Sequence, residues 1–127
     1  VRFCKNDVSL KVIDHTHVFI NQSIWDANCL KRAMEENDLL DTRVLEYNAY
    51  LYGMFFRDFS ITKEMLIKES SVFKSKINRG IILEFVNYIP EEWKPQQKDV
   101  DELVNYILYR VNNLDVIIST ILTYNNR

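Results

Sequence analysis

Glycine and proline are scarce in this chain, and their scarcity constrains its fold more than any other feature. Only two of each occur among 127 residues, whereas ordinary proteins have about one glycine in fourteen residues and about one proline in twenty. The turns of β-sandwiches and β-barrels depend on both residue types, and phosphate-binding loops depend on glycine. The composition therefore excludes most all-β folds and predicts a helical protein.

The length and charge of the chain are those of one soluble domain. At 15.2 kDa it can bury a single core, and its net charge of −2 gives no general attraction to nucleic acid or anionic lipid. Two cysteines, Cys4 and Cys29, are too few for the disulfide framework of a small secreted protein. The longest uncharged stretch near the C-terminus, 116–126, is too short to span a bilayer. We therefore expect residues 1–127 to form one intracellular domain with no integral membrane segment and no nucleic-acid partner.

The spacing of apolar residues predicts about five to seven helices. The expected helices cover residues 24–36, 42–59, a short segment around 65–67, 77–89, 99–111 and 114–124. Residues 77–89 are apolar on nearly every side, which is typical of a helix enclosed by others. Pro90 ends that helix, and Ser70 and Ser71 are expected to loosen the chain before it. The fold class predicted is an all-α bundle with a buried central helix.

Side chains that accept hydrogen bonds from backbone amides mark the starts of several of these helices. Ser23, with Asp26 three residues later, forms a weak capping box before the first helix. Asp41 precedes the second helix, and either Ser60 or Thr62 precedes the third. These positions predict where the helices begin.

Residues 8–20 fit two structures. Val8, Leu10 and Val12 alternate as they would in a strand, but Val12 also shares a helical face with Phe19. The pattern leaves both structures open. Two strands here, followed by helices, would resemble the small α/β adaptors of ubiquitin ligases, of the BTB or Skp1 kind, and that resemblance would imply an adaptor module for a ligase.

No arrangement typical of catalysis stands out. His15 and His17 are the only histidines, and on a strand they would share a face. A metal site needs further ligands, for which Asp14 or Cys4 would be the candidates. No serine or cysteine lies in a nucleophile elbow. We therefore expect a protein that is not an enzyme, with no catalytic residue, metal or cofactor.

Two short segments stand out together. The first, residues 30–36, reads Leu-Lys-Arg-Ala-Met-Glu-Glu, and the second runs from Phe73 through Asn78 and Gly80 to Phe85. The first resembles the homology-3 (BH3) motif of the Bcl-2 family, and the second resembles its homology-1 motif. The order of the two segments and their separation are also similar to those of the family.

The resemblance implies an anti-apoptotic protein that sequesters the BH3 motif of pro-apoptotic proteins, such as Bim, Bak or Bax, in a hydrophobic groove. Asn78 would cap a helix there, and Gly80 would let a partner helix approach the backbone closely. The alternative is a generic helical bundle in which a buried Gly80 admits a neighbouring helix of the same chain. The groove residues that the resemblance implies are Leu45, Asn48, Ala49, Tyr52, Met65, Leu66, Val72, Phe73, Asn78, Arg79, Gly80 and Phe85.

The second motif departs from the family's pattern at two positions. Arg79 stands where the family has tryptophan, and Ile81 stands where it has the arginine that pairs with an acid of the ligand. Residues two apart on a helix point about 200° apart, so Arg79 is not a simple replacement. We find no homology-2 motif and no membrane anchor near the C-terminus.

This divergent, compact form is similar to the survival proteins of large DNA viruses. That similarity implies a protein that blocks host cell death from the cytoplasm or from the surface of mitochondria. A homodimer is compatible with it, because aromatic residues such as Trp25, Tyr50 or Trp93 would form a self-association face if they were exposed.

Overall fold

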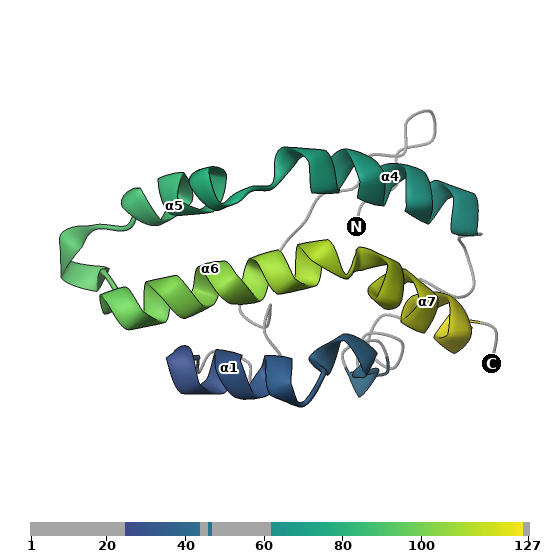
Figure 1. Ribbon diagram of the computed structural model, residues 1–127, viewed down its shortest axis with the longest axis horizontal. Coiled ribbons are helices and arrows are strands. Elements are labelled where there is room, and N and C mark those ends of the chain that lie inside the picture. Colours follow the sequence, from purple (N-terminus) through teal and green to yellow (C-terminus); the bar gives the residue numbers. More distant parts are fainter. Residues whose placement is uncertain (1–24, 44–45, 47–61, 126–127) are drawn as a thin grey trace, which may run out of the picture.

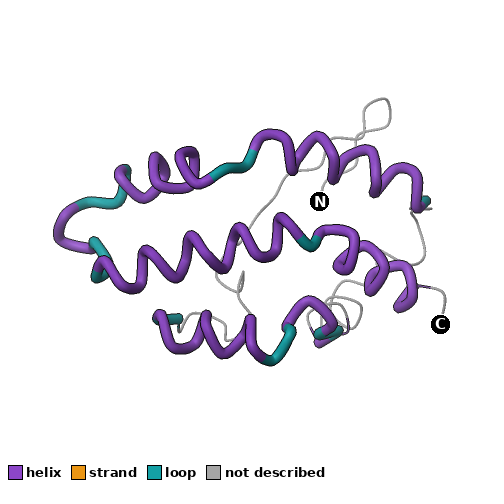
Figure 2. Tube along the Cα trace, in the orientation of Figure 1, coloured by secondary structure: helices purple, strands orange, loops and turns teal. Residues whose placement is uncertain are grey.

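The computed structural model describes residues 25–43, 46 and 62–125. Within these ranges the chain forms five α-helices and two short 3-10 helices, with no strand, which confirms the all-α class (Figure 2). The ambiguous segment 8–20 and most of the helix expected over 42–59 lie outside the described residues. The choice between helix and strands for residues 8–20 therefore stays a prediction.

The helices form three layers, and the middle layer contains two helices that follow each other (Figure 1). These are α6 (Gln97–Asn112) and α7 (Leu114–Asn125). On one side of them lie α5 (Arg79–Asn87), which packs on α6, and α4 (Lys63–Lys76), which packs on α7. We call α4, α5 and the turn that follows α5, residues 88–93, the outer layer.

The third layer lies on the opposite side of the middle layer (Figure 1). It consists of α1 (Ala27–Glu35), which packs on α6, and the 3-10 helix η1 (Asp38–Leu40), which packs on α7. A second 3-10 helix, η2 (Glu91–Trp93), joins α5 to α6. The helices in the middle layer are thus covered on two sides.

The core follows α6, which has more buried residues than any other described helix. They recur at helical spacing and include Val100, Val104 and Val111. In contrast, α5 buries only Ile82 and Val86. The prediction that residues 77–89 form the enclosed central helix is therefore wrong: α5 packs on α6 with one face. A continuous apolar run does not reveal whether its outward-facing residues will be covered.

Capping side chains begin three of the described helices. Thr62, rather than Ser60, caps α4, with its hydroxyl accepting a hydrogen bond from the Met65 amide at 3.3 Å. Asp26 caps α1 and accepts from the Cys29 amide at 2.7 Å. Trp25 lies outside that helix, so the expected start at residue 24 is too early.

The third capped helix is α5, where the Asn78 side chain accepts from the Ile81 amide at 3.1 Å. This confirms the prediction that Asn78 starts the helix. The helix ends at Asn87, two residues earlier than expected, and Pro90 restricts Ile89, so the helix cannot easily extend to that residue.

The α4 helix is longer than the sequence predicts. It runs for 14 residues and passes through Ser70 and Ser71 without a break. Both hydroxyls donate hydrogen bonds to the Ile67 carbonyl at 2.9 Å, so the serines are satisfied inside the helix. The prediction of a loosened chain at these serines is wrong for that reason.

Asp99 links two helices, although the sequence predicts only that a helix begins at this residue. The α6 helix begins at Gln97, so Asp99 lies in its first turn. The Asp99 carboxylate accepts a hydrogen bond from the Ala27 amide of α1 at 2.9 Å. This contact satisfies one of the free amides at the start of α1 and holds the starts of α1 and α6 side by side.

Candidate functional site

The structure describes eight of the predicted groove residues and places all of them in the outer layer (Figure 1). The other four, Leu45, Asn48, Ala49 and Tyr52, lie outside the described residues. On α4, Leu66 is half-buried, whereas Met65, Val72 and Phe73 are exposed. Phe85 of α5 is exposed as well, and Asn78, Arg79 and Gly80 lie at the start of α5.

Two clefts on the described part of the molecule lie elsewhere. One, of about 430 Å³, lies between η1 and α7 and is lined by Leu40 and Val116, among others. The other, of about 400 Å³, lies beside the end of α1 and is lined by Cys29 and Asp38, among others. None of the eight predicted groove residues that the structure describes lines either cleft. Apart from Leu66, the described members of the predicted set are therefore exposed in the outer layer, and neither of these two clefts lies between α4 and α5.

Gly80 is exposed, although the alternative of a generic bundle requires it to be buried. A Cβ atom added to Gly80 would meet Asn78 Oδ1 at 3.2 Å and no other described atom within 4 Å, apart from its own helix backbone and chain neighbours. No described helix thus uses the close approach that a glycine permits. The space above Gly80 is available to another molecule.

Arg79, which precedes Gly80, forms a weak ion pair with α6. Its guanidinium lies 3.8 Å from the Asp101 carboxylate, and both side chains are about half exposed, at 53% and 50%. An ion pair with this exposure contributes at most about 1 kcal/mol. Arg79 can therefore exchange Asp101 for an acid on a partner at little cost.

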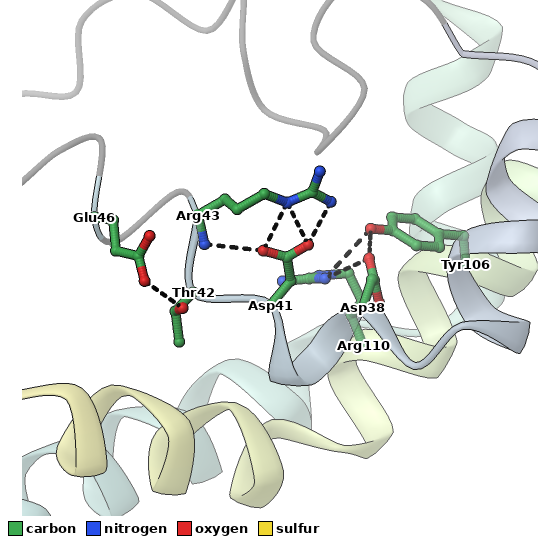
Figure 3. A network of polar contacts seen from close by, with 7 residues as sticks. All are labelled: Asp38, Asp41, Thr42, Arg43, Glu46, Tyr106 and Arg110. Atoms are coloured by element: carbon green, nitrogen blue, oxygen red, sulfur yellow. Dashed lines mark hydrogen bonds and ion pairs between the residues drawn. The ribbon is translucent and has the colours of Figure 1, made fainter.

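The most buried polar contact in the described residues joins η1 to α6, and sequence reasoning missed it (Figure 3). Asp38 of η1 has a side chain that is only 4% exposed. Its Oδ2 atom accepts hydrogen bonds from the Tyr106 hydroxyl and from Arg110 Nη1, the latter at 2.9 Å. Arg110 also donates to the Tyr106 hydroxyl at 3.3 Å and lies over the Tyr106 ring. We call Asp38, Tyr106 and Arg110 the buried triad.

The buried triad changes the chemistry of Tyr106. Burial, followed by the hydrogen bond to Asp38, raises the pKa of Tyr106 to about 12. The other Asp38 oxygen, Oδ1, is buried and has no hydrogen-bond partner among the described residues. A carboxylate so placed depends on its two donors, because an unpaired buried charge is strongly destabilising. The triad is therefore a structural contact that holds η1 against α6.

The turn before η1 supports the same contact. Asn37 has a φ of 55°, in the left-handed region that asparagine tolerates better than most residues. Its side chain accepts a hydrogen bond from the Tyr109 hydroxyl at 3.1 Å. The sequence signal that was available is the pair of aromatic and basic residues at i and i+4 on one face of α6, Tyr106 and Arg110.

The segment after η1 is held by local contacts (Figure 3). Arg43 Nε donates to Asp41 Oδ2 at 2.7 Å, and this hydrogen bond lowers the pKa of Asp41. Thr42 donates to the Glu46 carboxylate at 2.8 Å. Both contacts are exposed and span four residues or fewer, so they shape this segment without linking it to the outer layer.

In the ranges that the structure describes, no group of three or more His, Cys, Asp or Glu side chains is placed to hold a metal ion. His15, His17, Asp14 and Cys4 lie outside those ranges. Within the same ranges, no helix has both the length and the apolar character needed to cross a membrane.

Comparisons of the chain with protein-family models, with curated proteins and with solved structures found no match. The resemblance to the Bcl-2 family therefore rests on residues 30–36 and 73–85 alone.

Proposed function

We propose that this chain binds an amphipathic BH3-type helix on the outer layer, at α4 and the start of α5, and thereby inhibits cell death. The observation that carries the proposal is the exposure of Gly80 two residues after the Asn78 cap, with no described helix of the chain packed on it. A glycine in the first turn of a helix weakens that helix. Its presence at an open position is explained if a partner approaches the backbone there.

The exposed apolar residues of α4 support this proposal. Met65 and Val72 are seven residues apart, so they share one face of the helix over two turns, and Phe73 lies beside Val72. An amphipathic partner helix presents apolar residues at i, i+3, i+4 and i+7, which is a matching spacing. Covering exposed apolar surface stabilises a complex by about 25 cal/mol per Å² before the costs of association.

Arg79 supplies the polar element of the proposed contact. The arginine of the family's motif is Ile81 here, and Arg79 is half exposed beside Gly80 with only the Asp101 ion pair described for it. A hydrogen bond between charged groups contributes about 1.5–3 kcal/mol, which exceeds the value of the exposed pair. We propose that the conserved acid of the bound helix takes Arg79 from Asp101. Such a protein would act in the host cytoplasm, where pro-apoptotic partners of the Bim, Bak or Bax kind occur.

The test is a titration of the full chain with fluorescent BH3 peptides from Bim, Bak and Bax. We expect at least one peptide to bind with a sub-micromolar Kd. Gly80→Glu should weaken that binding at least about tenfold, which corresponds to 1.4 kcal/mol, because the new side chain occupies the space above the backbone. Asn105→Glu is the matched control, since it adds the same charge at an exposed position of α6.

Circular dichroism shows whether both variants keep the helical fold. Equal binding by the two variants would place the peptide away from Gly80. The absence of binding to all three peptides would refute the proposed function. Arg79→Ala, compared with a peptide whose acid is replaced by alanine, tests the polar contact separately, because the two changes should not be additive if the groups meet.

A further inference from the structure

The outer layer exposes large apolar side chains along its whole length. On α4 four of them are between 44% and 55% exposed, namely Met65, Ile67, Val72 and Phe73. At the other end three aromatic residues are exposed further: Phe85 by 66%, Tyr88 by 74% and Trp93 by 78%. Soluble domains seldom leave several large aromatic residues uncovered together unless the surface is an interface. Trp93 is thus exposed as a self-association face requires, whereas Trp25 is half-buried and Tyr50 lies outside the described residues.

The two halves of the outer layer carry opposite charges. The basic half is α4, in which four lysines outnumber two glutamates. The acidic half consists of α5 from Glu84 onwards and η2, with Glu91 and Glu92. Glu91 pairs with Lys94 at 2.8 Å. In the described part of the chain, no hydrogen bond or ion pair is formed by the side chains of Glu84, Glu92, Lys68 and Lys76.

We infer that two copies of this chain pair through the outer layer about a two-fold axis near the junction of α4 and α5. Each α4 then lies against α5 and η2 of the second copy, so that basic and acidic halves meet twice. The contact is self-complementary, as a two-fold interface must be.

The exposed area favours a second copy that covers both halves. A stable interface buries about 800 Å² on each partner. At roughly 150–250 Å² for each fully exposed aromatic residue, Phe85, Tyr88 and Trp93 together offer roughly 400 Å². The apolar residues of α4, about half exposed, add roughly 300 Å². Neither half is large enough alone, and both together approach the area of a stable dimer.

The second copy and the peptide of the proposed function would compete for the same surface of α4, but the test of the dimer contains no peptide and so does not depend on the proposed function. Sedimentation velocity on the full chain, from micromolar to sub-millimolar concentration, should show a monomer that passes into a dimer. The transition should move to higher concentration when salt is raised, since the charges involved are exposed. A monomer at every concentration would overturn the inference.

Charge reversal identifies the surface that pairs. Glu84→Lys with Glu92→Lys should weaken dimerisation at least about tenfold, because two basic halves then meet. Lys68→Glu with Lys76→Glu should do the same, because two acidic halves meet. An equimolar mixture of the two double variants should form a heterodimer, since each basic half again meets an acidic one.

All four substituted side chains are exposed, so the variants should fold, and circular dichroism checks this. Glu35→Lys with Glu36→Lys on α1 is the matched control and should dimerise like the unaltered chain. If only one double variant loses the dimer, or if the mixture stays monomeric, the two-fold pairing of α4 with α5 and η2 is wrong. A dimer lost in the α1 control would place the interface in the opposite layer and would also refute it.

Discussion

Replacing Tyr106 by phenylalanine tests whether the buried triad stabilises the fold. The substitution removes one oxygen atom and keeps the ring, which is buried in α6 and contacts the Arg110 guanidinium. Asp38 then retains only the hydrogen bond from Arg110 at 2.9 Å among those described. The change therefore removes the hydrogen bond to a carboxylate that is 4% exposed, together with the longer hydrogen bond that Arg110 donates to the same hydroxyl at 3.3 Å.

The expected loss follows from the charge of Asp38. A hydrogen bond to a charged group contributes about 1.5–3 kcal/mol, compared with about 1 kcal/mol for a neutral pair. We expect the upper part of that range, because Asp38 Oδ1 already lacks a described partner. For a domain of this size the loss corresponds to a fall of roughly 5–15 °C in Tm.

The assay is urea unfolding at neutral pH, followed by circular dichroism, with the free energy of unfolding taken by linear extrapolation. Tyr109→Phe is the matched control. It removes the same atom three residues later, where the hydroxyl makes an exposed hydrogen bond to the neutral Asn37 side chain. We expect this control to change the free energy of unfolding by about 0.5 kcal/mol.

Asp38→Asn completes the test. It removes the charge on which the strength of the Tyr106 hydrogen bond depends, so the effects of Asp38→Asn and Tyr106→Phe should not add, and the shortfall should be about 1 kcal/mol. Equal losses from the two tyrosine variants, or full additivity with Asp38→Asn, would refute the reasoning. The Tyr106 hydroxyl would then contribute no more to the free energy of unfolding than the exposed Tyr109 hydroxyl.

Three further predictions concern pH and single side chains. The pKa of Tyr106 is raised from 10.0 to about 12. The stability that the neutral form of Tyr106 provides is therefore complete below pH 10 and is lost as the pH rises towards 12. Over this interval, the free energy of unfolding of the unaltered chain should approach that of Tyr106→Phe. Asp99→Ala should lower the free energy of unfolding in urea by about 1 kcal/mol, because the Ala27 amide loses its acceptor. Asp99→Asn keeps an oxygen at this position and should lower the free energy of unfolding by less in the same assay. Gly80→Ala should leave the free energy of unfolding within about 1 kcal/mol of the original, since the gain in helix propensity is offset by the 3.2 Å approach of the new Cβ to Asn78 Oδ1. BH3 peptide binding should nevertheless weaken. Unchanged binding would show that Gly80 does not contact the peptide.

Local features of the fold could be predicted from the sequence. The caps at Thr62 and Asn78 depend on hydrogen bonds that span three residues, and a short sequence window contains both partners. The end of α5 before Pro90 is local for the same reason. The all-α class followed from the composition, because glycine and proline favour turns wherever they occur in a chain and only two of each occur here.

Other features depend on partners that are distant in the sequence. Asp38 and Tyr106 are 68 residues apart, and Ala27 and Asp99 are 72 apart, so no local pattern indicates either pair. The burial of α5 was mispredicted because the apolar run alone does not say which helix will cover it. For the candidate site, the sequence predicted the Asn78 cap at the start of α5, but the exposure of Gly80 depends on how the whole outer layer packs.

The hydrogen bond from Ala27 to Asp99 has a consequence for the order of folding. Together with the buried triad, it joins the α1 layer to α6 across loops of about 70 residues, whereas α5 and α6 pack across one short turn. Closing a long loop costs more chain entropy than closing a short one, and distant contacts form more slowly. We therefore expect α5, α6 and α7 to associate first and α1 to dock afterwards. Substitutions at Asp99 should then accelerate unfolding while leaving the folding rate nearly unchanged.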